Sequence, residues 1–220
     1  MRSCALLVLV ACSTTTAPPA NTKATPDVVT LAVVMSGWEI WIGNDKDPRV
    51  AKDAPERTPG ALDRVVAAFG KADLAHAAPN ARAVLVTYAD KAKVRVPLGP
   101  IANLTPAAFG TQQDYHEAMG VELLRALALA ADQLDAAPPG RHVLLVLGDG
   151  TDTDPQTALA EMPKLAERFA KFPVEVTAIV YRTQASADRD AIDKLTKHVT
   201  RAPTLDAFET ALVGALATVR

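Results

Sequence analysis

Three aspartates follow a single apolar run within six positions of the chain. The run covers residues 143–147, and its unbroken apolar character is typical of a strand buried on both faces. In an open α/β sheet, ligands bind beyond the carboxyl ends of the strands, and carboxylates are preferred ligands of Mg²⁺ and Ca²⁺. A cation site is therefore one interpretation of Asp149, Asp152 and Asp154.

The same segment also fits plain structural roles. Gly148-Asp149-Gly150 has the composition of an ordinary turn. Asp154 followed by Pro155 is typical of a helix start, with the aspartate as N-cap and the proline at the first helical position. On this loop alone, the cation site and the structural loop both stay open.

The motifs that would indicate an enzyme are incomplete. His116-Glu117 begins like the helix of a zinc protease, but Gly120 stands where the second histidine would bind the metal. The sequence contains no Gly-x-Ser-x-Gly elbow and no glycine-rich phosphate loop ending in Lys-Ser or Lys-Thr. We therefore expect a protein without catalytic activity. The remaining enzymatic alternative is a metal-dependent phosphoryl hydrolase that uses Asp149.

Composition narrows the class of partner. The chain has 220 residues and a net charge of -2, and its lysines and arginines are scattered, which argues against nucleic acid as a partner. The length suits one domain with a substantial core, and we expect a monomer. The two cysteines, Cys4 and Cys12, lie at the amino terminus, so the rest of the chain has no disulfide and no thiolate metal site.

The first 26 residues resemble an export address. Arg2 precedes a short apolar stretch, as in a signal peptide over residues 1–11. Leu9-Val10-Ala11-Cys12 resembles the lipobox of bacterial lipoproteins. That resemblance implies cleavage before Cys12, a diacylglycerol on its sulfur and a further acyl chain such as palmitate on the new amino terminus. The alternative for Cys12 is a small buried residue in an uncleaved helix.

Residues 12–26 are rich in Ser, Thr, Ala and Pro, which predicts a flexible tether between the lipid and a folded domain over residues 27–220. The expected location is the cell envelope, anchored to lipid on the periplasmic side of the outer membrane or on the cell surface.

The folded part alternates strands with helices. Apolar or alternating runs predict six strands, at 28–35, 83–88, 92–98, 143–147, 174–181 and 199–202. The short connection before 92–98 predicts an antiparallel edge strand, which Pro97 suits. Helical patterns follow Thr58-Pro59 and fill 115–136, 155–171, 188–198 and the stretch after Thr204. The predicted class is α/β: a doubly wound, mostly parallel six-stranded sheet with one antiparallel edge strand and helices on both faces.

This order of elements resembles the von Willebrand factor type A domain. The resemblance rests on 82–90 with 93–98, on 143–150 and on 208–216, and it extends over nearly all of 27–220. The family carries a metal-ion-dependent adhesion site, built from an Asp-x-Ser-x-Ser motif, a Thr and an Asp. Mapped onto this chain, these positions fall on Val34, Ser36, Trp38, the vicinity of Gln113 and Asp114, and Asp149.

The resemblance implies that the adhesion site is degenerate here. Val34 replaces a charged ligand, and Trp38 replaces a hydroxyl with a bulky ring that offers no oxygen donor. An alternative is a rebuilt site for Mg²⁺ or Ca²⁺, in which Asp45 and Asp47 approach the aspartates after residue 148, with Asp114 beside them. The other reading of these aspartates is a set of solvated turn residues. No cofactor is certain from the sequence.

We therefore expect a lipid-anchored, non-catalytic module for adhesion or scaffolding. It would bind another envelope or extracellular protein through the edge at which the parallel strands end, which we call the apical edge. The expected contact residues are Ser36, Trp38, Trp41, Asp114 and Asp149. Core packing is the alternative role of the two tryptophans, and burial of both indoles with Ser36 covered would contradict the contact role.

Overall fold

The computed structural model of the protein describes residues 28–38, 42, 60–115, 120–171, 174–181 and 191–219. The strands are β1 (Val28–Ser36), β2 (Arg82–Tyr88), β3 (Lys93–Pro100), β4 (Gly140–Gly148), β5 (Val174–Tyr181) and β6 (Val199–Ala202). The α-helices are α2 (Ala61–Ala72), α3 (Leu74–Ala77), α4 (Leu123–Asp135), α5 (Pro155–Ala170), α6 (Ile192–Leu195) and α7 (Leu205–Ala217). Short 3-10 turns are η1 (Ile101–Asn103), η2 (Pro106–Phe109) and η3 (Gln112–Tyr115).

All six strands form one sheet in the order β3-β2-β1-β4-β5-β6. Every pairing is parallel except that of β3 with β2, which confirms the predicted class and the antiparallel edge strand. Strand β1 lies at the centre, and its residues from Leu31 onward are buried, as an unbroken apolar run requires. Leu31 pairs with Val143, so the two apolar runs that define the predicted fold lie side by side.

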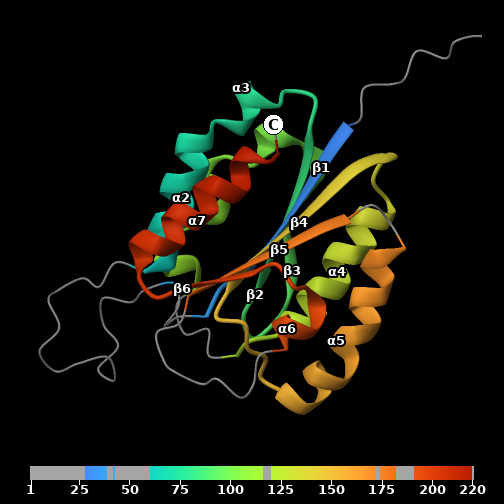
Figure 1. Cartoon of the computed structure of the whole chain (residues 1–220). Helices are drawn as coiled ribbons and strands as arrows, with labels where there is room; N and C mark the ends of the chain where they lie inside the picture. The colour runs from blue at the N-terminus through green and yellow to red at the C-terminus, as the bar shows by residue number, and fades with distance from the viewer. Residues whose placement is uncertain are drawn as a thin grey trace, which may run out of the picture.

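Helices cover both faces of the sheet (Figure 1). Helices α2 and α7 pack on one face, where alternate β1 residues such as Val33 and Met35 contribute to the core. Helices α4, α5 and α6 pack on the other face with Ala32 and Val34. The two layers thus arise from the period of two along a strand that is buried on both sides. None of the described helices combines the length and the apolar character needed to cross a membrane.

Strand β3 departs from simple alternation. The pairing of Leu85 with Val96 and of Val86 with Val94 leaves Arg95 as an extra residue, as in a β-bulge. Val94 and Val96 therefore pack on opposite faces of the sheet. Arg95 lies half-buried over the ring of Tyr115, with its guanidinium carbon 5.4 Å from the ring centroid.

Two helical predictions need correction. The helix predicted over 115–136 begins only at Leu123, because Tyr115 ends a 3-10 turn and residues 120–122 are not helical, with the Glu122 N–H donating to Ala89 in the β2–β3 turn. The helix predicted over 188–198 is described only as Ile192–Leu195. Helix α5 continues through Pro163, which is exposed and does not end it.

Candidate interaction site at the apical edge

The apical edge lies where the strand order changes direction. Strands β1 and β2 follow one another towards one side of the sheet, and β4 lies on the other side of β1. Such a switch point, beyond the carboxyl ends of the strands, is where open α/β sheets bind their ligands. The end of β1, the end of β2 and the loop after β4 therefore converge at the predicted position.

The end of β1 is closed by Trp38. The Trp38 amide N–H donates to the Ser36 hydroxyl oxygen at 3.2 Å, and Ser36 is fully buried. The Trp38 side chain is half-buried and packs against both apolar layers, so it lies across the end of the central strand. Ser36 therefore cannot contact a partner directly, whereas the indole retains exposed surface.

A tyrosine that the sequence analysis did not single out fills the space beside Ser36. Tyr88 is the last residue of β2, pairs with Ser36 in the ladder and is fully buried. Its carbonyl oxygen accepts the Gly37 N–H at 2.6 Å, which ties the ends of β1 and β2 together. A methyl carbon on Gly148 would overlap the Tyr88 hydroxyl oxygen, so the phenol lies directly against the glycine that ends β4.

The buried environment disfavours ionisation of this phenol. Burial raises the pKa of Tyr88 well above its ordinary value, and the negative charge of Asp149 raises it further. A contact with the Ser36 hydroxyl acts in the opposite direction on the Tyr88 pKa. No well-formed hydrogen bond to the Tyr88 hydroxyl is present among the described residues. A neutral phenol between a serine and an aspartate can offer an oxygen donor but no charge.

The aspartates after β4 are bound by their own loop. The Asp149 carboxylate is buried and accepts the Thr151 hydroxyl at 2.5 Å and the Thr151 N–H at 3.3 Å. Asp154 is the N-cap of α5 and accepts the Thr157 N–H at 3.1 Å and its hydroxyl at 2.7 Å. These Thr157 hydrogen bonds lower the pKa of Asp154. Both residues thus have the structural role that the turn and N-cap pattern allows.

Asp152 links this loop to the next helix. Its carboxylate accepts the Leu124 N–H at 2.8 Å, one of the amides left unpaired in the first turn of α4, and the Asp154 N–H at 3.0 Å. Val121 and Thr153 exchange two further hydrogen bonds, from Thr153 N–H to Val121 oxygen at 2.8 Å and from Val121 N–H to the Thr153 hydroxyl at 2.7 Å. The loop after β4 is therefore fixed to the segment before α4.

The β2–β3 turn joins the same assembly. The Asp90 carboxylate accepts the Gly120 N–H, the Ala89 oxygen accepts the Glu122 N–H at 3.1 Å, and the Glu122 carboxylate accepts the Ala92 N–H at 2.9 Å. These three segments surround a hollow of about 450 Å³. Its charged lining residues are Asp90, Glu122, Arg125, Asp152 and Asp154. The hollow is thus predominantly acidic.

Asp114 belongs to a separate group. It accepts the Thr111 N–H at 2.7 Å and its hydroxyl at 3.0 Å, and the Arg95 guanidinium lies 3.5 Å away. The Thr111 hydrogen bonds, with a further effect of Arg95, lower the pKa of Asp114. The neighbouring Tyr115 ring packs against Gly37, where an added methyl carbon would come within 2.7 Å of it. Asp114 therefore belongs to the turn that supports the end of β1.

The described residues do not assemble the ligand set of the adhesion site. Val34, the position to which the resemblance assigns the first aspartate, is buried in the core, and Trp38, assigned to the second serine, is half-buried. Ser36 and Asp149 are the residues that agree with the ligand pattern implied by the resemblance. Within the described ranges, no three residues among His, Cys, Asp and Glu come together as a metal cluster. Asp45, Asp47, Trp41 and Cys12, the predicted lipidation residue, lie outside the described residues.

Comparisons with solved structures place this fold among von Willebrand factor A-like proteins. The PilB minor pilin from Streptococcus sanguinis matches with a TM-score of 0.66 and 10% identity over 88% of this chain and 61% of that chain. The pilus adhesin SpaC from Lactobacillus rhamnosus GG matches at 0.61 and 11% identity, over 88% of this chain and 30% of that one. A von Willebrand factor type A protein from Catenulispora acidiphila matches at 0.56 and 15% identity, over 88% and 42%.

This chain therefore spans less than two thirds of the length of these three proteins. No protein-family model matches the sequence, and the comparison with curated proteins gives no match. At these identities the similarity establishes the fold, which is von Willebrand factor A-like, and the fold alone.

Proposed function

We propose that the protein is a lipid-anchored, non-catalytic binding module whose apical edge contacts another envelope or extracellular protein without a cation. The observation that carries this proposal is the fully buried Tyr88 phenol, which lies directly against Gly148 beside Ser36 and Asp149. Two positions to which the resemblance assigns cation ligands are occupied by Val34 and Trp38, which offer no oxygen donor from their side chains, and the Tyr88 ring packed against Gly148 brings no charge. Mg²⁺ gives up its water only to several anionic ligands, so the described donor set does not suit it.

The geometry supports a binding surface in two ways. The loops are joined by hydrogen bonds between backbone amides and Asp90, Asp152 and Glu122, so the edge is shaped in advance of any contact. The half-buried Trp38 offers an aromatic surface, a residue type enriched where interfaces are strongest. Because Ser36 and Asp149 are buried, their proposed role is to support the edge, while Trp38 and the acidic hollow meet the partner.

The neighbours in fold and the amino-terminal sequence support the proposed setting. Two of the solved structures with this fold are a minor pilin and a pilus adhesin, which are surface proteins by their names. The lipobox-like Leu9-Val10-Ala11-Cys12 supports a lipid anchor in the cell envelope. The alternative, a cation-dependent adhesion module, draws on the acidic hollow and on Asp45 and Asp47.

Thermal unfolding of the full chain with and without Mg²⁺ or Ca²⁺ separates these two functions. A cation that binds the native state at one hundred times its Kd would stabilise it by about 2.7 kcal/mol. For a chain of this size, that raises the Tm by about 5–11 °C. We expect no rise with either ion at millimolar concentration. A rise in that range would refute the cation-independent proposal in favour of the rebuilt site.

Partner binding is tested by a photoreactive amino acid at position 38, used in intact cells. We expect a cross-linked partner that persists when chelator is added and that is lost from pull-downs with Trp38→Ala. The matched control is Val213→Ala on α7, which also trims an exposed apolar side chain, 37% exposed, away from the apical edge. Capture of the partner in equal amounts by the Trp38→Ala and Val213→Ala variants would contradict the proposed role of Trp38.

A further inference from the structure

Strand β5 pairs with β4 along nearly its whole length but with β6 only along its carboxyl-terminal half. On the β4 side its ladder runs from Val174, opposite His142, to Val180, opposite Gly148. On the β6 side the ladder covers only Ala178–Tyr181, opposite Val199–Ala202. Within the described residues, the amino-terminal half of β5 is therefore an edge of the sheet, even though the strand as a whole is internal.

The backbone groups on this open side can be assigned. The Ala178 N–H donates to the His198 oxygen at 2.9 Å, so the even-numbered residues of β5 face the β6 side. The Val176 oxygen accepts the Thr196 hydroxyl at 2.9 Å, and the same hydroxyl oxygen accepts the His198 N–H at 3.1 Å, which closes the end of β6. Neither the Val176 N–H nor the Val174 N–H and oxygen has a described partner on that side.

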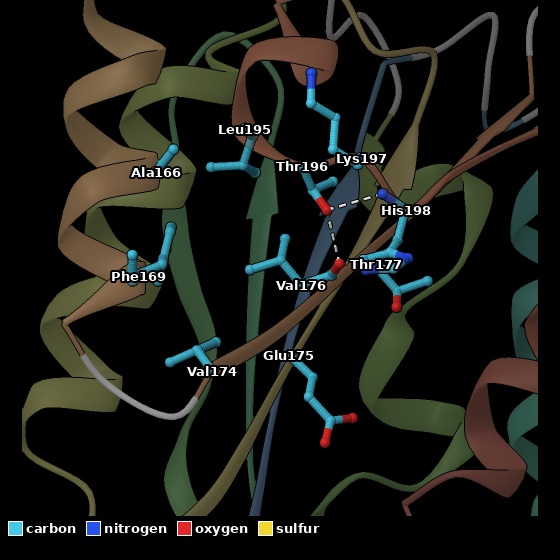
Figure 2. Close-up of a pocket in the computed structure, with 11 residues that line it drawn as sticks. Ala166, Phe169, Val174, Glu175, Val176, Thr177, Leu195, Thr196, Lys197 and His198 are labelled. Carbon is cyan, nitrogen blue, oxygen red and sulfur yellow. Dashed lines mark hydrogen bonds between the residues drawn. The ribbon is translucent and has the colours of Figure 1, made fainter.

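A hollow of about 620 Å³ lies beside these groups, between the end of α5, the start of β5 and the turn after α6. Figure 2 shows the side chains of Ala166, Phe169, Val174, Val176 and Leu195 gathered on one side of β5, with Glu175 on the other. The hollow therefore has an apolar wall along a row of open backbone groups. An added strand would fit this arrangement, since its backbone would pair with β5 while alternate side chains entered the hollow.

Charge indicates what kind of strand would fit. Lys197 lines the hollow, is exposed and has no carboxylate partner among the described residues. Glu175, the acidic residue of the lining, is held by Arg141 through two hydrogen bonds of 2.9 and 2.8 Å. A carboxylate on the incoming strand would complement the charge of Lys197.

We infer that the open half of β5, at Val174–Thr177, accepts an extended segment of a partner protein that is apolar at alternate positions and carries a carboxylate opposite Lys197. The site lies towards the amino end of β5, whereas the proposed adhesion surface lies at the carboxyl ends of the strands. It therefore does not depend on the function proposed for the apical edge.

The test uses the full chain and a capped peptide of sequence Glu-Val-Thr-Val-Thr-Val-Thr, followed by NMR. We expect the amide shifts of Val174, Val176 and Lys197 to change on titration, and hydrogen exchange of the Val174 and Val176 amides to slow at least tenfold at saturation. A peptide of the same sequence that is N-methylated at every residue keeps all the side chains but lacks every N–H group that could pair with β5, and we expect it not to bind.

Charge is tested by a pair of matched variants. Lys197→Glu should weaken the binding of the glutamate-containing peptide by about threefold, which is the scale of one exposed ion pair. Lys194→Glu makes the same change on α6 outside the lining of the hollow and should leave binding unchanged. Unchanged exchange at Val174 and Val176 up to millimolar peptide would overturn the inference, as would equal binding of the N-methylated peptide. Shifts confined to the apical edge would also overturn it and leave the function proposed there untouched.

Discussion

The contact between Tyr88 and Gly148 can be tested by a double-mutant cycle. In Gly148→Ala, the new methyl carbon would overlap the Tyr88 hydroxyl oxygen and come within 3.3 Å of the Ser36 Cβ. Cβ atoms essentially never approach another heavy atom within 3.0 Å, so one of these groups must move. Tyr88 is fully buried between β2 and the α4 layer and has no free space to enter.

The expected magnitude follows from overpacking. Forcing a methyl group into a packed site costs about 1–3 kcal/mol of the free energy of unfolding. Tyr88→Phe alone should cost about 1 kcal/mol or less, since its hydroxyl makes no well-formed hydrogen bond among the described residues. In the double variant the nearest ring atom, the Tyr88 Cζ position, would lie 3.3 Å from the methyl carbon, which a shift of a few tenths of an ångström relieves. We therefore expect a coupling energy of about 1–2 kcal/mol in favour of the double variant.

Urea unfolding at neutral pH of the wild type, both single variants and the double variant measures this coupling, provided that the m value is unchanged. The control is Gly214→Ala on α7, where an added methyl carbon meets nothing within 4 Å. That change should stabilise by up to about 1 kcal/mol through helix propensity. Additivity of the two apical changes within about 0.5 kcal/mol would show that the phenol does not lie against Gly148 and would remove the main support for a cation-free edge.

Three further predictions concern other parts of the chain. Glu209→Gln should destabilise the protein by about 1 kcal/mol at pH 7, because Glu209 on α7 accepts hydrogen bonds from Lys71 at 2.5 Å and Arg64 at 2.8 Å on α2. These bonds, that of Lys71 first, lower the folded-state pKa of Glu209. The difference in unfolding free energy between wild type and Glu209→Gln should thus have its full size above the pKa that Glu209 has in the unfolded chain. It should vanish as the pH falls through the pKa of Glu209 in the folded protein, which urea unfolding at several pH values would show. Burial raises the pKa of Tyr88 strongly and that of Tyr115 to about 12, so ultraviolet titration should find these two phenols neutral at about pH 10.5. Because folding favours their protonated forms, the free energy of unfolding should fall as the pH rises further. Ionisation of all three tyrosines of the chain near pH 10 without unfolding would contradict this prediction. Cys12→Ser should leave an unprocessed chain without lipid, which mass spectrometry of the intact protein detects, and a mature lipidated Cys12→Ser protein would exclude the predicted anchor.

The architecture could be predicted because it follows from two patterns that act locally. Unbroken apolar runs at 28–35 and 143–147 indicate strands buried on both faces, and the helical patterns between them require crossovers in a parallel sheet. These patterns depend on side-chain polarity alone, so the sequence contains them directly. The bulge at Arg95 was missed because alternation in 92–98 is regular in sequence, and the extra residue is defined only by pairing with β2.

The site was less predictable, since it depends on which side chains meet across strands. The aspartates after β4 could be identified, but their partners, Leu124, Thr151 and Thr157, are mostly backbone and hydroxyl groups without a distinctive pattern. Tyr88 ends an apolar run and reads as an ordinary core residue. Its position became informative only through its pairing with Ser36 and through Gly148, whose missing side chain makes room for the phenol.

These contacts show how the apical edge would hold its shape if, as we propose, it binds without a cation. A cation at the ends of β1 and β4 would hold the surrounding loops by attracting their carboxylates. In this protein each of those carboxylates is already held by donors of the chain, Asp149 by Thr151, Asp152 by Leu124 and Asp90 by Gly120. The loops are thus fixed by hydrogen bonds, and the buried Tyr88 phenol lies against Gly148 at the end of β4. Affinity for a partner must then come from surface that remains exposed, which makes the Trp38 indole, and not a shared metal ion, the group on which proposed binding depends.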